Sequence, residues 1–349
     1  MNIVEFLGLI CREPVLLIVS LLISGVVFVN GWTDAPGAIT ASVSTGALKM
    51  KNAAVLAAVF NFCGALIMGT LNSSVMRSVG EITMLIGNGK GSIAVLCASM
   101  LSIIIWATFA WFFGIPTSES HALISGVLGG ALAVGAEITV HSFNALKLAL
   151  IGLIFSVPAG CLVGIFCSKI INLTFRNINA QKRERFIKRG QIVGAASMAF
   201  MHGAQDSQKF AGVFVAAMCM TSNVPSDIGL NNAPVWITVI CSILIALGTS
   251  AGGYRIIKKV GMDTVNLTAE KGLASDIAGA TCMLLASVGG IPVSTTHTSS
   301  ASIIGAGISD KNGNLNTSSL KDMILAWAFT FPSCGLISFG LAKLFMLIF

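Results

Sequence analysis

The chain has 349 residues, of which 55% are hydrophobic and only 10% are charged, and its mean hydropathy is +0.87. Soluble domains carry roughly 25% charged residues, so this composition excludes an ordinary soluble protein and indicates an integral membrane protein. The net charge of +7 does not indicate a nucleic-acid partner, because the basic residues gather in short segments between apolar stretches.

Seven apolar stretches follow one another along the chain. Several reach the ~20 residues that an α-helix needs to cross a hydrocarbon layer of ~30 Å. Lipid requires every backbone polar group to be satisfied within the protein, and helices meet that requirement. We therefore predict an all-α protein of the cell (plasma or inner) membrane, multi-pass and in contact with lipid. The stretches are 15–30, 52–69, 93–113, 122–136, 148–167, 235–251 and 323–349.

The basic segments predict an orientation. Lys and Arg are densest at 176–189, and a second basic segment covers 255–271, whereas 221–234 has neither residue. The positive-inside rule places the two basic segments in the cytoplasm and 221–234 outside. Lys49 and Lys51 follow the first long apolar stretch and are also assigned to the cytoplasm, which leaves the N-terminus outside.

Two motifs occur twice at nearly the same separation. The sequence NGWTD at 30–34 has a counterpart HGAQD at 202–206, and GIPTSESH at 114–121 has a counterpart GIPVSTTH at 290–297. The two aspartates are 172 residues apart, and the two prolines of the second motif are 176 apart. Two unrelated motifs at one spacing indicate an internal duplication of the chain.

The duplication and the charge pattern together predict an inverted repeat. The first repeat covers 1–172, a basic cytoplasmic linker covers 173–190, and the second repeat covers 191–349. If the first copy starts outside and the second starts at the cytoplasmic linker, the two copies are inverted in the membrane. Inverted repeats with broken helices and re-entrant hairpins are typical of secondary transporters, whose site lies near the midplane where the halves meet.

The NGWTD and HGAQD motifs each place an aspartate inside an apolar stretch. Residues 15–46 are too long for one straight span, and Pro36 beside Asp34 predicts a break that frees backbone carbonyls. We expect 192–220 to repeat this arrangement around Asp206. A carboxylate beside free carbonyls suits a small cation, and intramembrane carboxylates are costly enough to be functional candidates. The alternative is an aspartate that is protonated or caps a helix.

The second motif predicts a helix start that binds an anion. Proline and Ser or Thr in a first helical turn leave hydroxyls beside unpaired N–H groups, and the positive end of the helix favours phosphate-like anions. Two such starts facing one centre would hold a tetrahedral oxyanion. The alternative is ordinary N-capping by Ser118 and Ser294 without a ligand. For His121 and His297, orientation of a neighbour, substrate binding and simple packing remain equally open.

At these motifs the chain resembles the PiT-type inorganic phosphate transporters, a family that also includes sulfate permeases. The resemblance covers both halves, with 292–297 as a full match to the hairpin motif. It implies an inverted-repeat helical transporter of inorganic phosphate, a homodimer, and coupling to Na⁺ or H⁺. Asp34 and Asp206 would be the cation and coupling carboxylates. The implied phosphate-binding residues are Ser118, Ser120, Ser294, Thr295 and Thr296, to which the motif adds Thr117, His121 and His297.

The chain also departs from the family pattern around each aspartate. Thr33 and Gln205 stand where the family has Asn before each Asp, and Lys209 stands where it has Asn three residues after Asp206. Glu119 replaces a hydroxyl residue in the first hairpin. We count Thr33, Gln205 and Lys209 among the coupling residues. Lys209 could replace a bound cation, pair with an aspartate or reach water, so H⁺ and Na⁺ remain alternatives.

Two other classes are alternatives to a phosphate transporter. An intramembrane hydrolase could use the aspartates or a Ser–His pair, but such an enzyme has no need of two symmetric copies. An anion channel would share the helix starts without needing carboxylates, and a sulfate or other oxyanion permease would share everything. We expect no enzymatic activity and no cofactor, with Na⁺ at Asp34 and Asp206 as the possible metal ion. The nine cysteines include no Cys-x-x-Cys pair, so we expect no other metal site.

Overall fold

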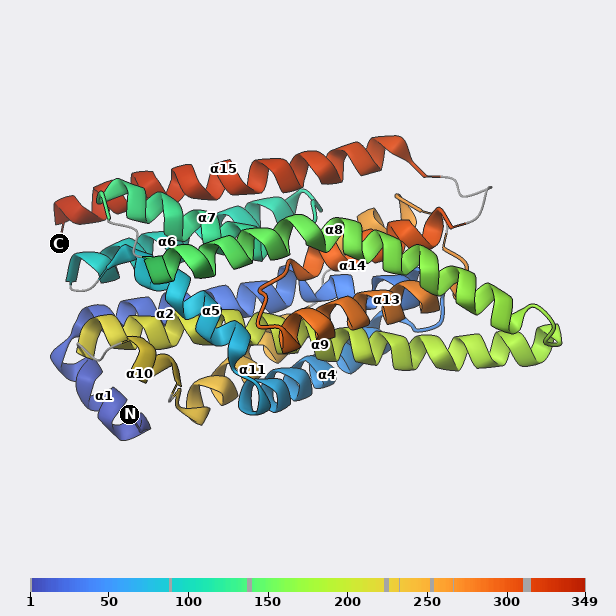
Figure 1. Cartoon of the computed structure of the whole chain (residues 1–349), viewed down its shortest axis with the longest axis horizontal. Coiled ribbons are helices and arrows are strands. Elements are labelled where there is room, and N and C mark those ends of the chain that lie inside the picture. Colours follow the sequence, from blue (N-terminus) through green and yellow to red (C-terminus); the bar gives the residue numbers. More distant parts are fainter. Residues whose placement is uncertain are drawn as a thin grey trace.

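The computed structural model describes residues 2–87, 90–136, 140–222, 226–231, 233–251, 254–265, 267–309 and 315–348. Within these ranges the chain forms helices and short connections, and the β pairing there is an isolated bridge between Val265 and Leu315. Most of the long helices lie side by side along the long axis of the molecule (Figure 1). The expectation of an all-α protein is confirmed.

The described helices include long, span-sized elements and several short ones. In chain order they are α1 (Ile3–Arg12), α2 (Pro14–Thr33), the 3₁₀ turn η1 (Ala35–Ile39), α3 (Thr40–Ser44), α4 (Met50–Leu71), α5 (Ser74–Thr83), η2 (Met84–Ile86), α6 (Lys90–Phe112), α7 (Glu119–Ala133), α8 (Val140–Phe175), α9 (Ala180–Ser222), α10 (Ser226–Asn231), α11 (Val235–Ser250), α12 (Tyr254–Ile257), the π-helical turn η3 (Lys258–Met262), α13 (Ala269–Val288), α14 (Thr295–Gly307) and α15 (Thr317–Ile348).

Five helical segments among the described residues are long and apolar enough to cross a membrane. A sixth is obtained if α11 and the bent segment that follows it form one span. The five are Pro14–Ser44, Met50–Leu71, Gly91–Phe112, Ser142–Phe175 and Thr317–Leu347. Many of their apolar side chains are exposed on the monomer, as lipid-facing positions require. The chain is therefore a multi-pass membrane protein.

The order of elements in the first half recurs in the second. The sequence α4, α5, α6, α7, α8 corresponds to α11, α12 with η3, α13, α14, α15, and the segment from α2 to α3 corresponds to α9. Packing between the halves is reciprocal, because α14 packs on α8 while α7 packs on α15, and α9 packs on α4 while α2 packs on α11. Each of these helices of one half therefore packs on a helix of the other half.

Glycines make the reciprocal contacts between helices close. A side chain at Gly31 would meet the Ile245 carbonyl oxygen at 2.3 Å, and one at the corresponding Gly203 would meet the Asn61 carbonyl oxygen at 2.1 Å. Neither position tolerates a Cβ without backbone movement. Small residues let helices approach where lipid provides no hydrophobic drive to associate. These glycines therefore fix how α2 and α9 lie against α11 and α4.

The basic segments lie at one end of the bundle. Arg183 at the start of α9 forms an ion pair of 3.0 Å with Glu270 at the start of α13, and Gln191 donates to Thr45, shortly before Lys49, at 2.8 Å. The N-terminus lies at the opposite end, where the Phe6 ring packs 5.6 Å from that of Phe214. This arrangement fits the expected orientation. Segment 221–234 lies partly outside the described residues, and 173–190 is mostly helical, belonging to the end of α8 and the start of α9.

Candidate functional site: two hairpin tips against two buried aspartates

Each half contributes a hairpin whose turn has the same backbone geometry. Gly114 and Gly290 follow α6 and α13 with φ of +67° and +65°, a region that glycine enters without steric cost. The next N–H groups, of Ile115 and Ile291, donate to the carbonyls of Ala110 and Ala286 at 2.9 Å, closing the helix ends. The chain then runs extended through the proline and reverses into α7 or α14.

Ser118 and Ser294 cap the two reversed helices. The Ser118 hydroxyl accepts from the His121 N–H at 3.2 Å, and the Ser294 hydroxyl accepts from the His297 N–H at 3.1 Å. The prolines lie two residues before the caps rather than in the first helical turn, because the extended Pro-x-Ser segment makes the reversal. Both serines are therefore the N-caps of their helices in this conformation. The neighbouring hydroxyls at 120, 295 and 296 make other contacts.

Asp34 lies where α2 changes into the 3₁₀ turn η1. Pro36 cannot donate an α-helical hydrogen bond, and the break expected at this position is confirmed. The carboxylate is 5% exposed and accepts from Thr295 at 2.9 Å on Oδ2 and from Thr296 on Oδ1. The Thr296 hydroxyl also lies 3.0 Å from the Thr117 carbonyl oxygen, so the two hairpin tips are in contact. The tip of the second hairpin is thus in direct contact with Asp34.

Asp206 lies in an unbroken helix. The expectation that 192–220 would break as 15–46 does is wrong, because α9 continues from Ala180 to Ser222. The reason is that Gln208 stands at the position of Pro36, so no N–H is lost and no ring clashes with the preceding turn. The backbone beside Asp206 therefore offers no free carbonyls, and the carboxylate is satisfied by side chains instead.

Those side chains surround Asp206 with donors. Lys209, one turn further along α9, places its Nζ 2.7 Å from Asp206 Oδ1, and Asn30 donates to Oδ2 at 2.9 Å. Thr295 lies 3.1 Å from Oδ2, and the His202 Nε2 lies 3.4 Å from the same oxygen. Thr295 therefore bridges the two aspartates. Lys209 is 2% exposed, so its ammonium pairs inside the protein and does not reach water.

Lys209 also holds the two hairpins together. Its ammonium donates to the Ser120 hydroxyl and to the Val293 carbonyl, both at 2.7 Å, and Ser120 in turn donates to the Val293 carbonyl at 3.1 Å. All three N–H groups of the ammonium thus have partners, counting Asp206. A buried charge without such partners would be strongly unfavourable. Lys209 therefore connects α9 to both hairpins within the site.

Thr33, Glu119 and Gln205 form the outer part of the cluster. The Thr33 hydroxyl lies within hydrogen-bond distance of the Glu119 carboxyl and of the Val29 carbonyl, and the contact with Glu119 ties α2 to the first hairpin. Gln205 donates to the Ser287 hydroxyl at 2.9 Å, so its amide faces α13 and not an aspartate. Glu119 is 2% exposed, and its second oxygen has no protein partner.

The two histidines of the hairpins lie against each other. The His121 and His297 rings are 4.5 Å apart between centroids, and His297 also packs 4.3 Å from Trp327. His121 Nδ1 lies 2.7 Å from the capping Ser118 hydroxyl. These contacts favour packing and orientation of the helix starts over direct contact with the aspartates.

Asn30 and His202 belong to the site but were not singled out from the sequence. Both lie four residues before an aspartate, one turn away on the same helix face, and this spacing was the available signal. Asn30 reaches across to Asp206 of the other half, while His202 contacts Asp206 on one side and Asn61 of α4, at 3.1 Å, on the other. One oxygen from each aspartate and a nitrogen of His202 lie within 4.8 Å of one another.

The arrangement defines a class of protein. Two helix starts from opposite halves and two buried carboxylates converge inside a multi-pass helical bundle, as in secondary transporters that bind an anion and a coupling cation at the centre. The model of the phosphate transporter family matches residues 30–338. The chain therefore belongs to the phosphate transporter family, a family of transporters and not of enzymes, which removes the hydrolase alternative.

Individual relatives agree with the family. The chain is 34% identical to a Bacillus subtilis protein named "Probable low-affinity inorganic phosphate transporter", over 87% of this chain and 89% of the relative. A Rhizobium meliloti protein of the same name is 32% identical over 89% and 90% of the two chains. A solved structure described as "The sodium-dependent phosphate transporter" has a TM-score of 0.83 at 21% identity, covering 97% of this chain and 100% of that one. The likeness to this solved structure shows that the two proteins share a fold.

Proposed function

We propose that the protein moves inorganic phosphate across the cell membrane together with a cation, at the site between the hairpin tips and the two aspartates. One observation carries the proposal. Thr295 of the second hairpin bridges Asp34 and Asp206, while Ser120 of the first hairpin contacts the Lys209 ammonium. Elements of both halves therefore meet at one charged centre. Membership of the phosphate transporter family indicates phosphate as the substrate.

The hairpins provide the chemistry for an oxyanion. The starts of α7 and α14 carry the positive ends of their helix dipoles. The hydroxyls of Ser120, Thr295 and Thr296 are rotors that both donate and accept, so they can turn from their present partners toward phosphate oxygens. Lys209 adds a positive charge beside them. Hydroxyls and an ammonium together match an anion with several acceptor oxygens.

The two aspartates are not equivalent as cation ligands. Asp206 accepts from the Lys209 ammonium, which has no lone pair to offer a cation, and from the NH₂ group of Asn30. Asp34 accepts from two threonine hydroxyls, which can redirect a lone pair toward a cation. We therefore assign the coupling cation, whether H⁺ or Na⁺, to Asp34. Lys209 takes the place that a second cation would occupy at Asp206.

Transport requires the site to open alternately to each side. Asp34 is 5% and Asp206 1% exposed, so the conformation described here encloses the site. We propose that the halves are inverted repeats that move relative to each other around it. The reciprocal packing of α14 on α8 and of α7 on α15 supports this proposal. A homodimer, which the family resemblance implies, is part of the same proposal.

Uptake into proteoliposomes tests the function. The purified full-length protein is reconstituted, and accumulation of labelled phosphate is followed with an imposed H⁺ or Na⁺ gradient, with sulfate and arsenate as competitors. We expect phosphate to accumulate above its outside concentration and arsenate to compete. Equilibration without accumulation would indicate a channel, and competition by sulfate with weak phosphate uptake would indicate a sulfate permease. Native mass spectrometry of the same preparation reports the oligomeric state.

A further inference from the structure

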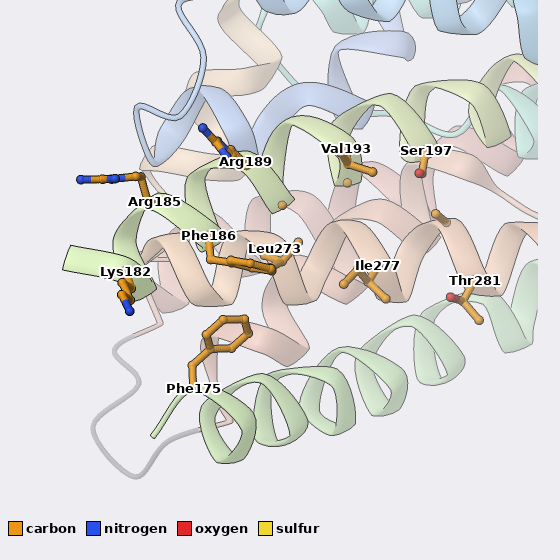
Figure 2. A pocket seen from close by; sticks show the side chains of 13 residues that line it. Phe175, Lys182, Arg185, Phe186, Arg189, Val193, Ser197, Leu273, Ile277 and Thr281 are labelled. Atoms are coloured by element: carbon orange, nitrogen blue, oxygen red, sulfur yellow. The ribbon is translucent and has the colours of Figure 1, made fainter. Parts of the chain in front are cut away.

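A groove whose lining includes none of the residues of the site described above lies at the basic end of the bundle. It is bounded by the end of α8, the first half of α9 and α13, and encloses about 800 Å³. Figure 2 shows Lys182, Arg185 and Arg189 at one end, with Val193 and Ile277 extending away from them. The groove therefore has a cationic end and an apolar length.

The walls of the groove are aromatic and aliphatic. Phe175 of α8 packs 5.9 Å from Phe186 of α9, and Leu273 of α13 lies beside Phe186 (Figure 2). Phe186 is 69% and Val193 65% exposed, although both lie on a helix that is buried at its other end. Large apolar side chains at such exposure are stable when hydrocarbon covers them. The exposed apolar walls thus indicate that lipid acyl chains cover the groove.

The depth of the groove comes from small residues. Gly190, Gly194 and Ser197 recur along one face of α9, opposite Ala280 and Thr281 of α13. A Cβ at Gly194 would lie 2.9 Å from the Asp276 Cβ, so α9 and α13 touch there and form the floor. The Arg183–Glu270 ion pair fixes the two helices at their basic ends. The shape is therefore built into the helix packing.

The groove is long enough for an acyl chain. From Lys182 to Ser197 the helix rises roughly 22 Å, which exceeds the ~15 Å half-thickness of a hydrocarbon core. A second cavity of about 610 Å³ shares Val193, Ser197, Ala280 and Thr281 with the first and continues along α4 and α9. The apolar path thus extends from the cationic end toward the middle of the bilayer.

We propose that this groove binds an anionic diacyl phospholipid, with the headgroup phosphate at Lys182, Arg185 and Arg189 and an acyl chain along Val193 to Thr281. Charge complementarity selects the headgroup, because clustered Lys and Arg at a membrane boundary attract anionic lipids. The apolar walls select a lipid over free phosphate, which would leave them in water. A second copy of the chain is disfavoured, because three cations would face the equivalent cations of a two-fold related copy.

Native mass spectrometry of the full-length protein in detergent tests the site. The protein is incubated with dioleoyl phosphatidylglycerol or dioleoyl phosphatidylcholine, and retained lipid is counted. We expect selective retention of phosphatidylglycerol, reduced about tenfold or more in Lys182→Gln/Arg185→Gln/Arg189→Gln. The matched control, Lys51→Gln/Arg176→Gln/Lys188→Gln, removes the same charge from exposed positions outside the groove and should retain lipid as the native protein does.

A second variant tests the apolar part without changing charge. Ser197 is exposed in the groove, so Ser197→Phe fills it without burying a clash and should also lower phosphatidylglycerol retention. Equal retention in the native protein and the charge-neutralised variant would overturn the proposal. The proposal would also be overturned if millimolar inorganic phosphate displaced the lipid and Ser197→Phe did not change lipid retention. That result would assign Lys182, Arg185 and Arg189 to binding of free phosphate. A dimer that Ser197→Phe dissociates would instead assign the groove to a second copy.

Discussion

The Lys209 ammonium lies 2.7 Å from the Asp206 carboxylate, one turn away on the same helix, and the two residues are only 2% and 1% exposed. The pair is i, i+3 on α9, a spacing at which side chains face each other. It lies between the two hairpins, and its other contacts reach Ser120 and Thr295. A buried ion pair at this point makes the stability of the fold depend on the charge of the candidate site.

The first prediction concerns this pair. Lys209→Met should destabilise the protein by about 3–5 kcal/mol, because it leaves the Asp206 carboxylate buried without its cation. Asp206→Asn should have a similar cost, whereas Lys209→Met/Asp206→Asn should recover much of the loss. Thermal unfolding in detergent, followed by size-exclusion chromatography, measures all three. Additive losses in the double variant would show that the two residues do not stabilise each other.

The second prediction concerns coupling. Lys209→Asn removes the internal cation and adds an amide oxygen, which a hard cation prefers. We expect native uptake to depend more on pH than on Na⁺, and Lys209→Asn to depend more steeply on Na⁺. Uptake in Na⁺ and in choline buffers at fixed pH measures this, with Lys209→Arg as the control that keeps the charge. Abolition of native uptake in choline would mean that Lys209 does not replace the ion.

The third prediction concerns the bridging hydroxyl. Thr295→Val keeps the shape of the side chain but removes the one hydroxyl that lies within hydrogen-bond distance of both carboxylates. A hydrogen bond to a charged group contributes about 1.5–3 kcal/mol. Phosphate uptake should fall at least about tenfold. Thr298→Val is the matched control, since Thr298 lies on the same helix but donates to the backbone carbonyl of Ser294. Comparable loss in the two variants would point to general damage to α14 and contradict the role of Thr295.

The fourth prediction concerns helix packing. Gly203→Ala would place a Cβ about 2 Å from the Asn61 carbonyl oxygen, and Gly31→Ala would do the same at Ile245. Both should lower the yield of monodisperse protein, because neither helix backbone can retreat without losing contacts. Gly340→Ala, on α15 with nothing within 4 Å of the added methyl, should be neutral. Tolerance of Gly203→Ala would mean that α4 and α9 pack less closely than described.

The fifth prediction concerns orientation. In a background without reactive cysteines, Asn179→Cys should be protected from an impermeant thiol reagent in intact cells, because it lies in the basic segment assigned to the cytoplasm. Asn231→Cys, at the exposed end of α10 in the segment assigned to the outside, should react. The reverse labelling pattern would show that the protein is inserted the other way around.

Much of the architecture followed from the sequence because it depends on local and periodic features. Apolar stretches of span length predict membrane helices whatever their partners. Duplicated motifs at 30–34 and 202–206 indicate two halves, and Gly114 and Gly290 mark turns whose backbone requirements are intrinsic to glycine. The break beside Asp34 was predictable for the same reason, since Pro36 acts on its own helix.

The pairing of side chains was decided by the tertiary structure. The sequence by itself determined that Asp34, Asp206, Lys209 and the hairpin hydroxyls belong to the candidate site, but a repeat makes the aspartates look equivalent. The fold makes them different, because α9 stays helical where α2 breaks and Lys209 therefore faces Asp206. That Thr295 bridges both carboxylates depends on where α14 meets two helices from different halves. Contacts between residues so far apart in the chain depend on packing, which no local pattern records.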